Sequence, residues 1–197
     1  MTTTTQSSPR ERILNTAIDL FYRQGYQATG INQIIAEAGV AKASFYANFP
    51  SKDDLLLAYA EAISAKEMAE MRAGLATLDT PRDRFYGLFT LLPGWLQEYD
   101  FRGCPFQIIL AEAPSGDERL HAVAKRHHEL MIDLARELLE DYQAANPSLK
   151  PVDNEQLARL FVVLMDGAIA AAVAYRDNWP IDQAVKTVKS LVEPVAY

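Results

Sequence analysis

Two short helix-forming runs on either side of a glycine restrict the fold of this chain more than any other feature. The first run covers residues 31–38 and the second residues 42–48, with Gly39 in the short connection. A turn this sharp needs a residue in the left-handed backbone conformation, which glycine adopts without steric cost. The spacing therefore predicts a helix-turn-helix over about residues 31–50.

The side chains of this segment divide into an apolar and a polar set. The apolar set, which we expect to pack between the two helices, consists of Ile34, Ala38, Val40, Phe45 and Phe49. The exposed face of the second helix is predicted to carry Lys42, Ser44, Tyr46 and Asn48. Such groups can reach phosphates and base edges in the major groove of DNA. The geometry alone is also compatible with an ordinary helical hairpin that has no role in DNA binding.

The rest of the chain also has helical periodicity. Gly25 is predicted to end the first helix, and Ser51 to cap the helix that begins at residue 52. Thr80-Pro81 is expected to begin another helix, and Pro93 to bend or break it. The expected helices cover residues 10–24, 31–38, 42–48, 52–78, 81–92, 105–113, 117–144, 154–176 and 180–192. No alternating run is long enough for a strand. We therefore predict an all-α fold of about nine helices.

Composition constrains the location of the protein. Residues 1–8 are rich in Thr and Ser, lack the segments of a signal peptide and are predicted to form a disordered tail. The longest apolar-rich run, residues 161–174, is interrupted by Asp166 and is too short to cross a bilayer. These features predict a cytoplasmic protein with no membrane partner. The single cysteine, Cys104, excludes an intrachain disulfide.

The net charge of −7 is unusual for a chain that binds DNA, but it is unevenly distributed. Residues 1–60 carry five basic and five acidic residues, so all of the excess acid lies in residues 61–197. Because residues 1–60 have no strong basic patch, non-specific attraction to phosphates should be weak. Affinity would have to come from fitted contacts and from the pairing of two copies.

The N-terminal segment also resembles the DNA-binding domain of the TetR (tetracycline repressor) family. The matching positions are Gly25-Tyr26, Thr29, Ile34, Ala38-Gly39-Val40, Ser44-Phe45-Tyr46, Phe49-Pro50-Ser51-Lys52 and Leu55. The resemblance covers about residues 10–60. It implies a three-helix DNA-binding domain at residues 9–60 and a helical effector-binding and dimerisation domain at residues 61–197. It also implies a double-stranded DNA operator, a small-molecule effector and a second copy of the chain as partners.

The resemblance assigns roles to individual positions. In the family, the positions of Lys42, Ala43, Ser44, Tyr46, Ala47 and Asn48 face the DNA, and those of Thr29 and Lys52 clamp phosphates. The predicted DNA-binding set also includes Gly30 and Asn32. Gly30 and Ala41 stand where Ser or Thr caps are usual, and Ala47-Asn48 replaces an aromatic-His pair. Because alanine offers only apolar contact, the bases that are read stay open.

Small and apolar residues near the C-terminus look like half of a four-helix interface between two subunits. The predicted interface consists of Ala168, Ala171, Ala172, Tyr175, Val185, Val188, Leu191 and Val192. The alternative is that both faces pack inside one subunit. The family resemblance favours the dimer.

Large apolar residues in the middle helices could line an effector pocket or simply form the core. The predicted ligand-binding residues are Phe89, Trp95, Phe106, Gln107, Leu110, His127, Met131, Phe161 and Met165. Such a pocket would take a mostly apolar or aromatic molecule.

Cys104 precedes Pro105 and is expected at a helix N-terminus, where the helix dipole favours a thiolate. The segment from Arg102 to Cys104 resembles the corresponding stretch of electrophile-sensing repressors of the family, which makes Cys104 a candidate redox residue. The alternative is a buried packing cysteine. His121, His127 and His128 share one helix without a third ligand at metal spacing, so we expect no metal and no cofactor.

The leading hypothesis is a homodimeric repressor that a small apolar or aromatic ligand releases from a palindromic operator. The alternatives are a thiol-based, electrophile-sensing repressor that acts through Cys104, and an activator without a small-molecule effector. A different class is an enzyme that uses the C-terminal helical domain. The sequence has no nucleophile motif, glycine-rich phosphate loop or paired-carboxylate site that would support an enzyme.

Overall fold

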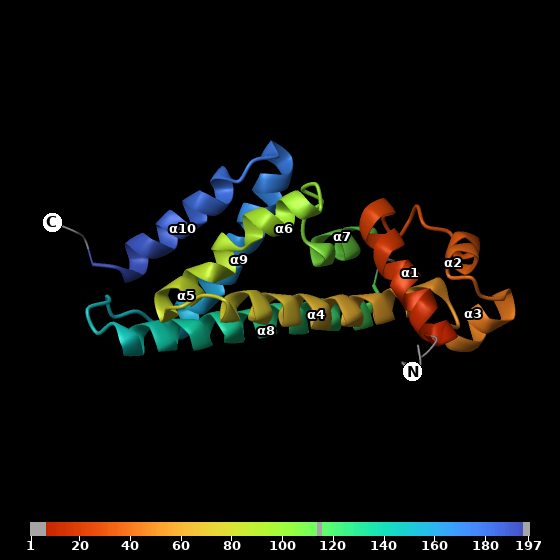
Figure 1. Ribbon diagram of the computed structural model, residues 1–197, viewed down its shortest axis with the longest axis horizontal. Coiled ribbons are helices and arrows are strands. Elements are labelled where there is room, and N and C mark those ends of the chain that lie inside the picture. Colours follow the sequence, from red (N-terminus) through yellow and green to blue (C-terminus); the bar gives the residue numbers. More distant parts are fainter. Residues whose placement is uncertain (1–6, 114–115, 195–197) are drawn as a thin grey trace, which may run out of the picture. The chain divides into compact units, whose positions relative to one another are not determined.

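The computed structural model describes residues 7–113 and 116–194, which form ten helices and no strand (Figure 1). The helices are α1 (Pro9–Gln24), α2 (Ile31–Glu37), α3 (Lys42–Asn48), α4 (Lys52–Ala76), α5 (Pro81–Thr90), α6 (Leu92–Glu98), α7 (Pro105–Glu112), α8 (Glu118–Ala145), α9 (Asn154–Tyr175) and α10 (Trp179–Val192). The all-α prediction is confirmed. The additional helix arises because the run expected at residues 81–92 breaks at Leu91, and α6 then begins at Leu92 with Pro93 in its first turn.

Most of the predicted tail, residues 1–6, lies outside the described residues. Ser8 is the N-cap of α1 and not part of a tail: its hydroxyl accepts a hydrogen bond from the backbone N–H of Glu11 at 3.2 Å. The Glu11 carboxylate accepts one from the Ser8 N–H at 2.7 Å. This reciprocal capping box satisfies two backbone donors that the first helical turn would otherwise leave free.

The chain divides into two compact units. The first unit contains the residues up to Ala65 together with Pro105–Ala124, and the second contains Lys66–Cys104 and the residues from Lys125 onward. The first unit is larger than the expected domain at residues 9–60, because it includes α7 and the start of α8. Periodicity along the chain gave no signal of this insertion.

The first unit has a core of aromatic and aliphatic side chains, and α1 packs against both α2 and α3. Phe21 lies edge-on to Tyr26 and Tyr59, with ring centroids 5.4 and 5.5 Å apart. Phe45 is fully buried and so anchors α3 from its inner face. Burial of such large apolar side chains is the dominant stabilising contribution in a domain of this size.

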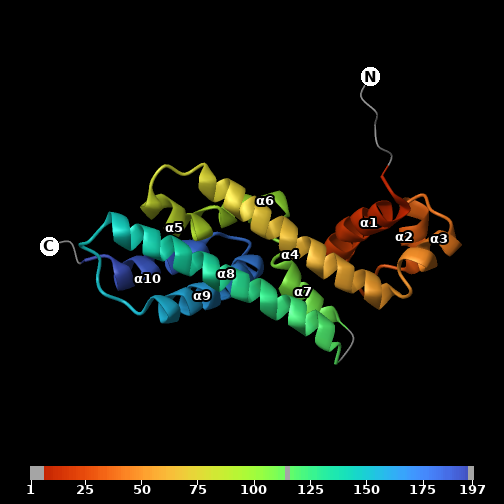
Figure 2. The ribbon, with the colours of Figure 1, turned by 90° about the horizontal axis from the view of Figure 1, so that it is seen from below.

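In the second unit, α9 packs against α10, and α10 packs against α5 (Figure 2). Phe89 and Phe161 lie with ring centroids 4.2 Å apart and are fully buried. At the end of α10, the Glu193 carboxylate accepts hydrogen bonds from the hydroxyls of Tyr86 and Tyr142, each at 3.1 Å. The second unit therefore combines an aromatic core with a half-buried polar clamp at its C-terminal end, formed by Glu193, Tyr86 and Tyr142.

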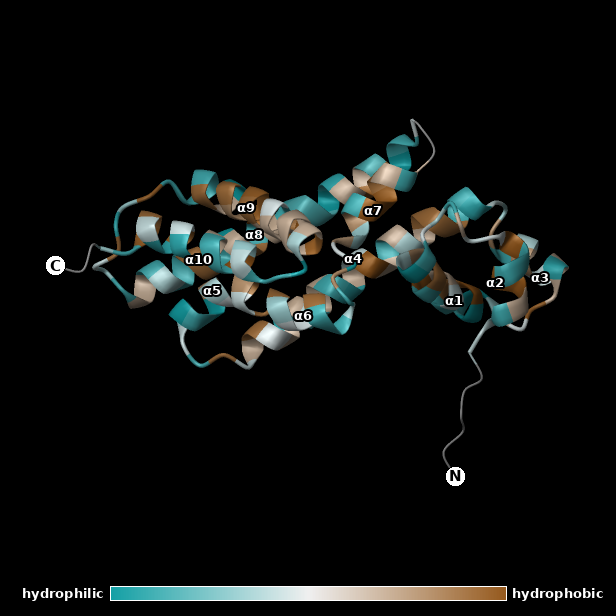
Figure 3. Cartoon of the chain, turned by 90° about the horizontal axis from the view of Figure 1, so that it is seen from above, coloured by the Kyte–Doolittle hydropathy of each residue, from teal (hydrophilic) through white to brown (hydrophobic). Residues whose placement is uncertain are grey.

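Helix α9 has 22 residues, so it is longer than the apolar run seen in the sequence and satisfies the length and composition of a membrane-spanning helix. Brown, hydrophobic segments alternate with paler and teal ones along it in Figure 3. Of its most apolar 18-residue window, 44% is buried within the protein. A single helix of this kind is weak evidence of a membrane span, because the core helix of a soluble protein meets the same criteria of length and composition.

Candidate DNA interface and ligand cavity

The turn between α2 and α3 has the geometry that the sequence predicts. Gly39 has a φ angle of 62°, in the left-handed region. The N–H of Val40 then reaches back to the carbonyl of Ile35 at 3.2 Å and closes the end of α2. Of the expected apolar wedge, Ile34, Ala38, Phe45 and Phe49 are buried and Val40 is half-buried. Packing of these residues fixes the direction of α3.

Helix α3 presents the predicted DNA-facing residues on its outer side. Lys42, Ala43, Tyr46 and Ala47 are exposed, and 41% of the Tyr46 surface is accessible. Ser44 and Asn48 are half-buried, and the Asn48 amide donates a hydrogen bond to the Ser44 carbonyl at 2.8 Å. The face thus combines one cation, one phenol and small side chains that allow close approach to a groove.

The predicted phosphate clamps lie in different environments. Thr29 is fully buried, and its hydroxyl donates a hydrogen bond to the Gly25 carbonyl at 2.7 Å. The Thr29 side chain therefore holds the α1–α2 loop together instead of facing solvent. Gly30 and Asn32, at the start of α2, are exposed.

Lys52 is half-buried at the start of α4, with its ammonium 4.1 Å from the centre of the Tyr26 ring. Burial lowers the Lys52 pKa, and this effect outweighs the negative charges of Asp53 and Glu112, which act to raise it. The Tyr26 hydroxyl donates a hydrogen bond to Asp53, and burial followed by that contact raises the Tyr26 pKa. Cation–π contact and hydrogen bond together tie the start of α4 to the loop after α1.

The predicted cap of α4 is confirmed. The Ser51 hydroxyl accepts a hydrogen bond from the Asp54 N–H at 3.0 Å and donates one to the Asp54 carboxylate at 2.6 Å. Arg119 pairs with that carboxylate at 3.1 Å and with Asp117 at 3.0 Å. The start of α8 is thereby joined to the start of α4 within the first unit.

The second unit contains a cavity of about 330 Å³. Its walls come from the last part of α4, from α6, α8 and α9, and from the turn before α7. The apolar lining residues are Met71, Gly74, Leu91, Leu92, Trp95, Met131, Val162, Met165 and Ile169. The polar lining residues are Glu67, Glu70, Glu98, Tyr99, Cys104, His127, His128 and Asp166. The volume is at the small end of the range of about 300–1,000 Å³ that ligand sites occupy.

The structure brings only part of the predicted ligand-binding set to this cavity. Trp95, His127, Met131 and Met165 line it. Phe89 and Phe161 do not, because each buries its ring against the other. Phe106, Gln107 and Leu110 lie on α7, which belongs to the first unit. No sequence pattern marked the carboxyl residues of the wall, because they stand on three separate helices, α4, α6 and α9, which form a common wall only when they pack together.

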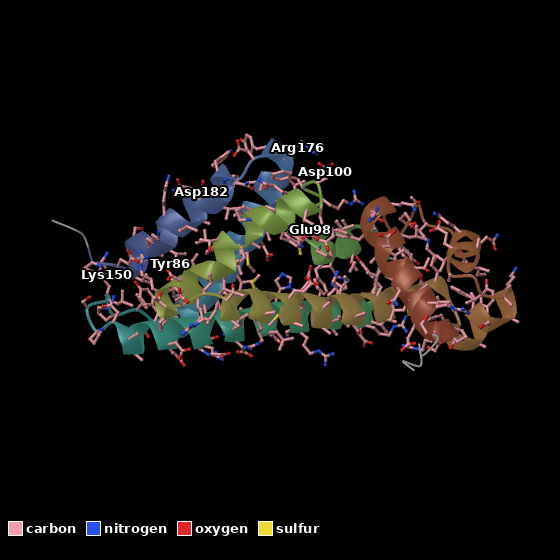
Figure 4. All side chains as sticks on the ribbon, in the orientation of Figure 1. Tyr86, Glu98, Asp100, Lys150, Arg176 and Asp182 are labelled. Carbon is pink, nitrogen blue, oxygen red and sulfur yellow. The ribbon has the colours of Figure 1, made fainter. Side chains whose placement is uncertain are left out.

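The turn that ends α6 has unusual backbone geometry. Asp100 and Phe101 have φ angles of 50° and 55°, and Gly103 has 94°. The Arg176 guanidinium pairs with the Asp100 carboxylate, and both side chains are labelled close together in Figure 4. This turn places Cys104 in the cavity wall, where it is buried directly before α7.

Most of the predicted dimer residues are already buried inside the single chain. Ala168, Ala172, Val185, Val188 and Val192 contribute to the core of the second unit. Ala171 is half-exposed, while Tyr175 and Leu191 are exposed. The α9 face that stays exposed carries Leu160, Val163, Gly167, Ala170 and Ala174 at helical spacing. The sequence periodicity identified two apolar faces but could not say which of them the chain covers itself.

Within the described ranges, no group of three or more His, Cys, Asp or Glu side chains is arranged to hold a metal ion. The ionisable groups near the cavity instead form two pairs. His127 Nε2 lies 3.5 Å from the Glu67 carboxylate oxygen, and His128 Nε2 lies 3.0 Å from that of Asp166.

A helix-turn-helix with an exposed second helix in the first unit, followed by a helical second unit with a cavity, is the architecture of a helix-turn-helix transcriptional regulator. Family comparisons agree with this class. Residues 13–59 match the bacterial regulatory proteins of the tetR family, and residues 81–188 match the tetracyclin repressor-like C-terminal domain. The chain belongs to the TetR family of transcriptional regulators.

Individual relatives extend over nearly the whole chain. The HTH-type transcriptional regulator YxaF of Bacillus subtilis is 27% identical over 194 residues, covering 96% of this chain and 97% of that protein. The crystal structure of the reduced form of E. coli NemR superposes with a TM-score of 0.81 at 25% identity and covers 93% of this chain and 97% of that chain. The crystal structure of the Streptomyces coelicolor regulator SCO4454 superposes with a TM-score of 0.78 at 28% sequence identity. The match covers 94% of this chain and 88% of that chain.

Proposed function

We propose that this chain is a cytoplasmic, homodimeric repressor that leaves a palindromic operator when a small ligand occupies the cavity of the second unit. The observation that carries the proposal is the continuity of α4. Its first residue, Lys52, contacts Tyr26 beside the helix-turn-helix, and its later residues Glu67, Glu70 and Met71 line the cavity. A ligand that moves the wall therefore acts on the helix that begins at the DNA-binding segment.

For release to occur, the ligand must prefer the conformation that does not bind DNA, since a ligand with equal affinity for both conformations shifts nothing. The test is a titration of the operator complex with candidate ligands, followed by the same titration on Trp95→Ala. Because Trp95 lines the cavity, this variant should shift the ligand dose response. Phe89→Ala is the comparison: Phe89 lies in the core, so it should lower stability without a comparable shift.

DNA recognition is assigned to the exposed face of α3. Tyr46→Ala should cost about 1–3 kcal/mol of specific affinity for the operator. Arg23→Ala is the control, because Arg23 is exposed on α1 and pairs with Asp19 at 2.7 Å. A folded Tyr46→Ala protein that protects the operator as well as wild type does would refute the assignment.

For the second subunit, we propose the exposed face of α9 as the contact. Val163 has 67% of its surface accessible, Leu160 39% and Tyr175 65%, which is unusual for large apolar and aromatic residues on one helix. Small residues at Gly167, Ala170 and Ala174 would allow close approach of two such helices.

A second candidate trigger is modification of Cys104 by an electrophile. It is favoured by the position of this thiol in the cavity wall directly before α7, and the structural relative NemR was crystallised in a form described as reduced. Under this mechanism Cys104→Ser abolishes induction, and a thiol reductant reverses it in the wild-type protein. Under ligand binding alone, Cys104→Ser leaves induction nearly unchanged.

A further inference from the structure

All formally charged residues in the cavity wall are acidic. They are Glu67, Glu70, Glu98 and Asp166, and no lysine or arginine lines the cavity in the described part of the chain. A carboxylate or phosphate ligand would meet only like charge there and could find few hydrogen-bond donors. A cation would meet complementary charge in a partly desolvated site, where electrostatic interactions are stronger than in water.

Two of these carboxyls are held by imidazoles from a neighbouring helix. Glu67 on α4 faces His127 on α8 at 3.5 Å, and Asp166 on α9 faces His128 on α8 at 3.0 Å. Burial raises the Glu67 pKa to about 8, and burial followed by the His128 charge lowers the His127 pKa to about 4. At pH 7 the empty cavity therefore holds Glu67 mainly protonated and His127 neutral.

The remaining wall suits the hydrocarbon part of a ligand. Trp95 and Tyr99 lie with ring centroids 6.2 Å apart, and both line the cavity. Met71, Met131 and Met165 add flexible, polarisable thioethers. Aromatic faces attract cations, and methionine side chains adapt to the shape of a ligand.

We propose that the cavity binds an organic cation, with its ammonium group at the Glu67 and Asp166 carboxyls and its aromatic or alicyclic body against Trp95, Met131 and Met165. This inference rests on the proposed function, because it specifies the chemical class of the effector. Binding transfers the Glu67 proton to solvent, since an adjacent positive charge favours the carboxylate.

The release of a proton makes the affinity for a cation depend on pH. Affinity should rise with pH until it levels off above the Glu67 pKa of about 8. The other titratable or charged groups around Glu67 are Lys66 and Glu70 on α4, His127 and His128 on α8, Asp166 on α9, Glu98 on α6, and Tyr99 and Cys104 in the turn after α6. The Glu67→Gln variant removes the contribution of Glu67 alone.

The experiment uses the whole chain with Trp179→Phe, which leaves Trp95 as its single tryptophan. Benzyltrimethylammonium and its larger trialkyl homologues are titrated against their uncharged carbon isosteres, of which neopentylbenzene is the first, and against the anion phenylmethanesulfonate. Trp95 fluorescence reports occupancy of the cavity. Calorimetry in two buffers of different ionisation enthalpy measures the number of protons that are released on binding. We expect the cations to bind at least about tenfold more tightly than their isosteres and to release about one proton at pH 7.

Glu67→Gln should weaken cation binding by about tenfold or more and abolish the proton release. The variant should fold normally at pH 7, because glutamine resembles the protonated glutamic acid that it replaces. Asp166→Asn should weaken binding independently of that proton. The control is Glu140→Gln on the exposed side of α8, which should leave cation affinity unchanged.

The proposal would be overturned if the uncharged isosteres or the anion bound as tightly as the cations. It would also be overturned if neither Glu67→Gln nor Asp166→Asn changed the affinity for the cations. Failure of every cation in the series to bind has the same consequence. Operator binding is measured on the same samples. Cations that bind through Glu67 without releasing the operator would support the site and contradict the effector role. Operator release by an uncharged ligand alone would leave the repressor proposal intact and refute the cation.

Discussion

The Glu112 carboxylate accepts a hydrogen bond from the backbone N–H of Gln27 at 3.1 Å, and the Glu112 carbonyl accepts a second from Gln27 Nε2 at 2.7 Å. The end of α7 thereby supplies backbone and side-chain partners to the loop between α1 and α2. Because α7 begins directly after Cys104, one short helix connects a residue of the cavity wall to the loop that precedes the helix-turn-helix. Alongside α4, α7 is a second helix that runs on from a cavity-wall residue, and hydrogen bonds at its end hold the loop before the helix-turn-helix.

Gly25→Ala should disturb this junction. Gly25 has a φ angle of 93°, and a Cβ there would lie 2.6 Å from the Glu112 carboxylate. We expect about 1–2 kcal/mol of backbone strain and about 1 kcal/mol more from the lost Gln27 contact. Gly39→Ala is the matched control: it has a φ angle of 62° and open space, so it should show only the strain. The measurement is urea unfolding of both variants.

Combining Gly25→Ala with Glu112→Ala isolates the steric part of that cost. The double variant should lose less stability than the sum of the single variants, because both remove the same hydrogen bond. Additive losses, together with equal effects of Gly25→Ala and Gly39→Ala, would show that the Glu112 contact contributes nothing to stability.

Thr29 and Lys42 should respond differently to salt. Thr29→Ala removes a buried hydrogen bond to the Gly25 carbonyl and should lower the free energy of unfolding by about 1 kcal/mol or more. Because that hydroxyl does not face solvent, the salt dependence of DNA binding should stay unchanged. Lys42→Ala should instead reduce the slope of log affinity against log salt by about one. Fluorescence anisotropy at several salt concentrations measures both slopes, and a reduced slope for Thr29→Ala would restore it as a phosphate contact.

Val163→Glu should dissociate the proposed dimer. The substitution places a carboxylate on the exposed α9 face, where a second subunit would bury it without a partner. Light scattering should show monomers, and operator affinity should fall because one subunit contacts a single half-site. Asp141→Lys, which changes charge on the exposed side of α8, should stay dimeric. A dimer that persists in the Val163→Glu protein would place the interface elsewhere.

The clamp at the end of α10 should make stability depend on pH. Burial acts to raise the Glu193 pKa, but hydrogen bonds from Tyr86 and Tyr142 and the charge of Arg82 outweigh it and lower the pKa. A carboxyl with a lowered folded-state pKa contributes stability above its unfolded value of about 4.3, and loses it as pH falls through the folded value. Tyr86→Phe should cost about 1 kcal/mol at pH 7 and less at pH 3.

Urea unfolding at the two pH values tests this expectation. Tyr175→Phe provides the matched control, because Tyr175 is exposed on α9, and it should have no effect at either pH. An equal loss for Tyr86→Phe at pH 7 and pH 3 would mean that the ionised Glu193 carboxylate is not its partner.

The sequence alone was sufficient for the helix-turn-helix and for every described helix except α6, because their signals are local. Gly39 must adopt a positive φ angle for the turn, Ser51 must cap α4, and the buried spacing of Ile34, Ala38 and Phe45 follows from one helical period. The boundary between the two units was beyond such reasoning. Helix α7 joins the first unit through contacts such as Glu112 to Gln27, which are 85 residues apart.

Which face of a helix is covered, and by what, was decided only by the tertiary structure. Periodicity marked Val188 and Phe89 as apolar, but an interface residue, a cavity-wall residue and a core residue have the same chemistry before the helices are packed. The same holds for polar groups. Thr29 was expected to contact phosphate and is buried, while Glu67 and Asp166, which no sequence pattern assigned to a site, line a cavity. Local propensity determines where helices begin and end, whereas burial depends on neighbours that are distant in sequence.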